Sequence, residues 1–82
     1  MDFGKTIYAK NNSNENEAKA ILDKVLEALK EKGYNPTLQL SEYLLSGDPT
    51  YITGHKDARK IITKVDREEI IEVLVEKYMG SN

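Results

Sequence analysis

The chain carries few side chains that could catalyse a reaction. It contains no cysteine, which excludes disulfides, thiolate zinc sites and thiol nucleophiles, and a single histidine, which excludes a histidine-rich metal site within one chain. That residue, His55, follows Gly54 at an expected helix start. The neighbouring Asp57 would point elsewhere, because residues i and i+2 do not share a helix face. We therefore expect His55 to be a surface or capping residue, and we predict no catalytic residue, no metal and no cofactor.

Basic side chains gather on the expected third helix. Lys56, Lys60 and Lys64 recur at every fourth position, with Arg59 beside them, so that on one helix they would form a single basic face. Such a face could hold the phosphates of a nucleic acid, an acidic partner or a phosphorylated residue. The alternative is an ordinary solvated helix face. Arg59 could also act as a structural fork that reaches Asp48 or a backbone carbonyl.

A hydroxyl group near the N-terminus is a further candidate. Thr6 lies in residues 1–13, which contain little that could be buried, and we expect this segment to be a flexible arm or one short strand. A kinase can reach a hydroxyl on such an arm, because the target segment must lie extended in the kinase cleft. A phosphate would add about −1.5 to −2 charges, for which residues 56–64 offer the nearest basic face. The alternative is that the phosphate does not bind this basic face and that a partner binds the phosphorylated peptide directly.

Length and composition limit the remaining function classes. The chain has 82 residues, 12 basic and 14 acidic side chains, a net charge of −2 and 39% apolar residues. That indicates one small globular domain, mildly acidic where a nucleic-acid-binding domain is usually basic. No apolar run approaches the roughly 18 residues of a membrane-spanning helix, and no secretory signal is present. We expect a cytoplasmic protein that oligomerises, because a small domain without disulfides often gains stability in that way.

Apolar spacing and capping residues predict an all-α fold of about four helices. The expected helices are 14–32, 35–46, about 55–64 and 66–80. Their N-caps are Asn14, Asn35 and Asp66, and the glycines that end three of them are Gly33, Gly47 and Gly80. Pro36 suits the first turn of the second helix, and Glu69 is the capping-box partner of Asp66. Residues 14–80 would thus form a helical dimerisation domain after the arm of residues 1–13.

Two of these helices have more apolar surface than a monomer needs. The second is apolar on two sides, and the apolar residues of the fourth cover roughly 200° at 100° per residue, about twice the arc that a helix on the rim of a monomer needs. We interpret the excess as a homodimer surface. The candidate interface residues are Tyr43, Leu44, Ile71, Leu74, Val75 and Tyr78.

Most of the chain, from the first helix to Tyr78, resembles the IreB family of small bacterial proteins. The motifs that carry the resemblance are Gly33-Tyr34-Asn35-Pro36, Ser46-Gly47-Asp48-Pro49-Thr50-Tyr51-Ile52 and His55-Lys56-Asp57-Ala58-Arg59. Each motif is weak alone, but their combination at constant spacing is specific. The likeness continues through Gln39, Arg67 and residues 72–75, and Lys5-Thr6 is similar to the threonine-containing N-terminal segment of the family.

The resemblance implies a non-enzymatic cytoplasmic regulator with a helical, dimeric folded part. The family is found mainly in Gram-positive bacteria. It includes a substrate of a membrane-anchored Ser/Thr kinase with extracellular PASTA repeats. That kinase and its opposing phosphatase govern cell-envelope stress responses and tolerance to cell-wall antibiotics. The phosphorylated threonine of that member corresponds to Thr6 here. The implied partners are the kinase, the phosphatase and an unidentified downstream protein.

Two other functions stay open at this point. One is a small nucleic-acid-associated protein that uses the basic face of the third helix, for which binding should weaken with salt. The other is a purely structural interaction module.

Overall fold

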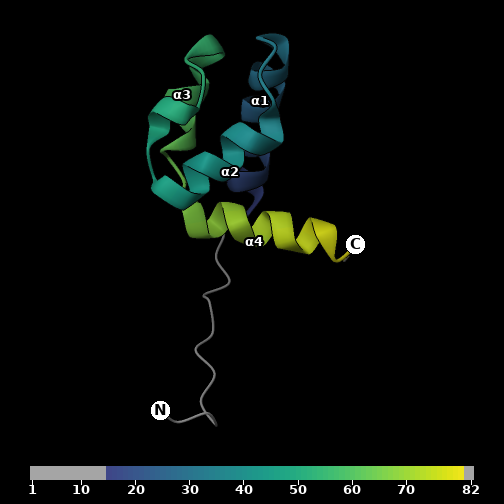
Figure 1. Ribbon diagram of the computed structural model, residues 1–82. Coiled ribbons are helices and arrows are strands. Elements are labelled where there is room, and N and C mark those ends of the chain that lie inside the picture. The colour runs from purple at the N-terminus through teal and green to yellow at the C-terminus, as the bar shows by residue number, and fades with distance from the viewer. Residues whose placement is uncertain (1–14, 81–82) are drawn as a thin grey trace, which may run out of the picture.

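The computed structural model describes residues 15–80, which fold into helices joined by short connections (Figure 1). The elements are α1 (Glu15–Glu31), α2 (Pro36–Ser46), η1 (Pro49–Tyr51), η2 (His55–Asp57), α3 (Ala58–Ile62) and α4 (Arg67–Tyr78), where η marks a 3₁₀ turn. Within the described residues there is no strand, so the predicted all-α fold with four helices is confirmed. The predicted arm, residues 1–13, and the Asn14 cap lie outside the described residues.

The core lies where α1 packs against α2, α3 and α4. In Figure 1, α4 crosses one end of the other helices and extends past α1. The largest fully buried side chains are Val25, Leu29, Ile52, Ile62 and Ile70, and α2 adds Leu40 and Tyr43. Burying one such side chain stabilises the folded state by about 1.5–3 kcal/mol. Because every helix contributes side chains to this core, its burial holds the helices together. No helix among residues 15–80 is long and apolar enough to cross a membrane.

The helix ends follow the predicted caps. The Asn35 side chain accepts a hydrogen bond from the Leu38 N–H at 3.1 Å, and Pro36 occupies the first turn of α2. Asp66 and Glu69 form the predicted capping box at the start of α4, where the Asp66 N–H donates to Glu69 Oε1 at 3.3 Å. These caps satisfy backbone donors that a helix start leaves unpaired.

The predicted third helix is wrong at both ends. A continuous helix from His55 to Lys64 is replaced by η2 and the five-residue α3, Ala58–Ile62. Lys56 and Asp57 have φ values of 53° and 61°, in the left-handed region that an α-helix excludes. The Arg59 N–H consequently bonds the Thr53 carbonyl at 2.9 Å, six residues back instead of four. At the other end, Thr63 Oγ1 donates to the Lys60 carbonyl, and the chain turns towards the Asp66 cap.

Gly47, which ends α2, packs against Arg67 at the start of α4. It is left-handed, with φ 76°, and its N–H donates to the Tyr43 carbonyl at 2.7 Å. A Cβ at this position would lie 2.9 Å from Arg67 Cζ. The guanidinium is held there because Arg67 Nη1 donates to the Leu44 carbonyl at 2.8 Å. Position 47 therefore favours glycine for two reasons: its backbone is left-handed, and Arg67 occupies the space that a Cβ would need.

Two alanine substitutions separate these requirements. Gly33 is also left-handed, with φ 83°, but a Cβ there meets nothing within 4 Å. We expect Gly33→Ala to cost about 1–2 kcal/mol through backbone strain alone. Gly47→Ala should cost up to about 1 kcal/mol more, because Arg67 must move away from the Leu44 carbonyl. Urea unfolding measures both changes in free energy.

An Arg67→Ala background provides the control for this comparison. There, the additional cost of Gly47→Ala over Gly33→Ala should disappear. Equal costs of the two alanines in the native background would contradict a packing role for Gly47.

Candidate functional site

The segment that follows Gly47 is fixed by hydrogen bonds between Asp48 and Thr50. Asp48 Oδ1 accepts from the Thr50 N–H at 3.0 Å and from Thr50 Oγ1 at 2.8 Å. These bonds to the ionised form lower the pKa of Asp48 below its ordinary value. Pro49 starts η1 with no N–H to satisfy. The Ser-Gly-Asp-Pro-Thr motif therefore makes a fixed turn at the end of α2.

Two long polar side chains then anchor the carbonyls at the end of this turn. Gln39 Nε2 of α2 donates to the Tyr51 carbonyl at 2.8 Å, and Arg59 Nε of α3 donates to the Ile52 carbonyl at 2.8 Å. Between them the Ile52 side chain is 0% exposed. Both carbonyls are thereby hydrogen-bonded within the chain. Arg59 thus has the structural use of reaching a backbone carbonyl, as weighed from the sequence.

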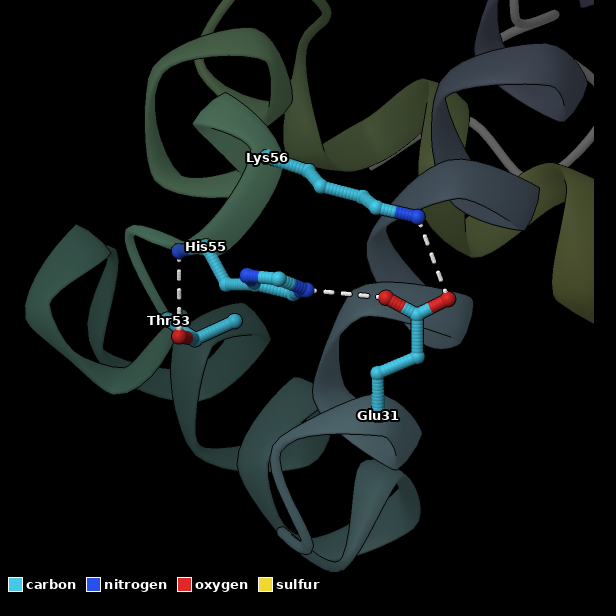
Figure 2. A network of polar contacts seen from close by, with 4 residues as sticks. All are labelled: Glu31, Thr53, His55 and Lys56. Atoms are coloured by element: carbon cyan, nitrogen blue, oxygen red, sulfur yellow. Dashed lines mark hydrogen bonds and ion pairs between the residues drawn. The ribbon is translucent and has the colours of Figure 1, made fainter.

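Glu31, at the end of α1, binds the next part of the segment through both carboxylate oxygens (Figure 2). Its Oε1 lies 2.8 Å from His55 Nε2, and its Oε2 lies 3.1 Å from Lys56 Nζ. The His55 N–H also donates to Thr53 Oγ1 at 3.2 Å. Since an ionised carboxylate only accepts hydrogen bonds, His55 Nε2 must carry the hydrogen in this contact. The bond from His55, then the bond from Lys56, lowers the pKa of Glu31.

This carboxylate contact was not found from the sequence. His55 lies at the surface, as expected, with its side chain 32% exposed, but its ring is paired with Glu31. The two residues are 24 positions apart, and nothing in the local pattern around either one points to the other. The contact places Lys56, whose backbone is left-handed, beside the end of α1.

The predicted basic face does not exist as one helical stripe. Because α3 covers only Ala58–Ile62, Lys56 precedes it and Lys64 follows it. Lys56 is paired with Glu31, and Arg59 is bound to the Ile52 carbonyl. Lys60 and Lys64 are exposed and make no ion pair with any residue of the range 15–80. Anion binding by these four cations stays a prediction, now with two of them already engaged.

The predicted dimer residues fall into three groups. Those on the outer side of α4 are Ile71, Val75 and Tyr78, which are 44%, 54% and 89% exposed. Leu44 and Leu74 are partly buried and pack against the core. Tyr43 is only 4% exposed in the single chain, so its side chain already belongs to the core and has little surface left for a partner.

Comparison with known proteins agrees with the motifs. The chain matches a protein family described as IreB regulatory phosphoprotein over residues 4–80. A UPF0297 protein of Ruminiclostridium cellulolyticum is 50% identical over 83 aligned residues, which cover 100% of this chain and 94% of the relative. Both alignments include Thr6 and all four helices.

The ionised form of Glu31 should make stability depend on pH. A carboxylate whose pKa is lowered in the folded state stabilises the protein above its unfolded value, here 4.5, and loses that contribution as pH falls through the lowered value. We expect Glu31→Gln to be less stable than the wild type at pH 7, with a gap that shrinks below pH 4.5. Urea midpoints at pH 7 and pH 3 measure this gap.

Glu27→Gln is the matched control, because Glu27 is exposed one turn earlier on α1 and makes no ion pair within residues 15–80. It should change the midpoint little at either pH. A Glu31→Gln gap of the same size at pH 3 as at pH 7 would show that the charge of Glu31 is not the cause.

Proposed function

We propose a regulatory function, starting from the fact that the chain belongs to the IreB family of regulatory phosphoproteins. The chain acts without catalysis, as the cytoplasmic substrate of a transmembrane Ser/Thr kinase that phosphorylates Thr6. An opposing phosphatase reverses the modification, and a downstream protein reads it in cell-envelope stress and antibiotic tolerance. The observation that carries this function is the family match, which spans residues 4–80 and so includes Thr6.

The position of Thr6 supports its role as the acceptor. Before α1 the chain has two aliphatic hydroxyls, Thr6 and Ser13, and α1 itself has none. Ser13 lies two residues from Glu15, where α1 begins, so a kinase that needs an extended peptide around Ser13 would have to unwind the helix start. Thr6 lies nine residues from Glu15, which is far enough to enter a kinase cleft while α1 stays folded.

The basic side chains support a regulator more than a nucleic-acid binder. A nucleic-acid-associated protein would need the basic residues to face phosphates, and Lys56 and Arg59 have internal partners instead. With a net charge of −2, little remains to drive phosphate binding. Binding of DNA or RNA that falls steeply with salt would favour that alternative.

A kinase assay tests the acceptor assignment. Thr6→Ala should abolish incorporation of phosphate by the cognate transmembrane kinase, while Ser13→Ala should be modified as fully as the wild type. Thr6→Ser should restore the modification, because it returns the hydroxyl. Intact mass measurement reads the stoichiometry. Full modification of Thr6→Ala would remove Thr6 as the site.

The proposed active form is a homodimer formed through the outer face of α4. Ile71, Val75 and Tyr78 are spaced i, i+4 and i+7 and form an exposed apolar stripe on that helix. Helices in a monomer seldom expose such a stripe, because contiguous apolar surface is usually covered by a partner.

Val75→Glu should shift the protein towards monomer, because a charge buried at an interface without a partner costs several kcal/mol. Leu45→Glu is the matched control, since Leu45 is 82% exposed on α2 and lies outside the proposed interface. Sedimentation at tens of micromolar measures association, and circular dichroism checks that both variants fold. A wild type that stays monomeric, or a dimer unaffected by Val75→Glu, would contradict this interface.

A further inference from the structure

An apolar groove lies between α1, α2 and α4, apart from the exposed stripe of α4. Its lining includes Leu26 of α1, Leu40 and Leu44 of α2, and Leu74 of α4. Three of these side chains are only partly buried, so the groove leaves leucine surface open. Along α1 the surface beside Leu26 carries the carboxylates of Asp23 and Glu27. The groove therefore combines apolar lining with an acidic edge.

We propose that residues 1–14 of the same chain occupy this groove, and that a phosphate on Thr6 displaces them. The chemistry of this N-terminal segment complements the groove on both counts. Phe3, Ile7 and Tyr8 supply apolar side chains for the leucines, and Lys5 and Lys10 supply cations for the acidic edge. The release step rests on the function proposed above, whereas the docking step does not.

The segment is long enough to reach the groove. Leu26 lies eleven residues after Glu15, which places it about 17 Å along α1 from the helix start. Ile7 lies eight residues before Glu15, and an extended chain of that length spans about 26 Å. The chain must reverse direction to run back along α1, and Asn11-Asn12-Ser13-Asn14 has the residue types that favour turns.

A phosphate on Thr6 would reverse the charge of the segment. Residues 1–14 contain two lysines and one aspartate, a net side-chain charge of +1. Phosphorylation adds about −1.5 to −2, which makes the segment negative. Thr6 adjoins Ile7, so the phosphate would lie close to the leucines and to the carboxylates of Asp23 and Glu27. Lys30 at the groove offers one cation, which does not outweigh two carboxylates and the cost of removing a phosphate from water.

Thiol accessibility in the full chain tests both steps, and the absence of native cysteine makes the probe specific. Ser41 is exposed at the groove, and Thr63 is exposed at the end of α3, outside it. We expect the thiol of Ser41→Cys to react about tenfold more slowly than in the same chain carrying Phe3→Ser and Ile7→Ser, as for a groove covered about nine-tenths of the time. The thiol of Thr63→Cys should react equally fast in both backgrounds. Asn11→Ser, which keeps the apolar side chains, should leave the protection of Ser41→Cys unchanged.

The release step uses a chemically synthesised chain with phosphothreonine at position 6, so that it does not depend on any kinase. The thiol of Ser41→Cys in this chain should react as fast as in the Phe3→Ser, Ile7→Ser background. Continued protection of the phosphorylated chain would overturn the release step. Failure of a kinase to modify Thr6 would instead count against the proposed function and leave the docking result standing.

Two results would overturn docking itself. One is a reaction rate of Ser41→Cys that does not respond to the substitutions at Phe3 and Ile7. The other is protection that disappears on dilution, which would show that a second copy of the chain covers the groove instead of the N-terminal segment.

Discussion

Burial of Ile52 is the constraint on which most of the surrounding structure depends. Its side chain is 0% exposed although it lies in a connection between helices, and its carbonyl needs a donor inside the folded chain. To bring Ile52 into the core, the chain must turn sharply after α2 and turn again before α3. Gly47 and Asp48 make the first turn, and the left-handed Lys56 and Asp57 make the second. Such backbone conformations persist only where surrounding contacts enforce them.

The same constraint explains what the long polar side chains do. Gln39 and Arg59 bind the carbonyls that flank the buried side chain, Arg67 bridges α2 and α4, and Glu31 holds the second turn. These residues belong to, or directly contact, the motifs by which the chain resembles its family. The motifs are therefore architectural: they maintain a small fold that has no disulfide to stabilise it.

The described helices leave open an apolar stripe on α4 and an apolar groove between α1, α2 and α4. A family of regulatory phosphoproteins needs a place for the modification and a surface whose availability changes with it. In the function proposed above, a phosphate on Thr6 would act on these surfaces through its charge, without any rearrangement of the core.

The sequence by itself determined the family, the all-α class, and the ends of α2 and α4. Those ends depend on interactions over three or four residues, such as Asn35 with Leu38 and Asp66 with Glu69, so local chemistry is sufficient to predict them. Only the tertiary structure decided the shape of α3, the burial of Tyr43 and the pairing of His55 with Glu31. An uninterrupted helical pattern from His55 to Lys64 was overridden because Ile52 must enter the core and Glu31, 24 residues away, binds the turn that allows it. Contacts between residues so far apart leave no periodic pattern in the sequence, because the geometry that brings them together exists only once the helices have packed.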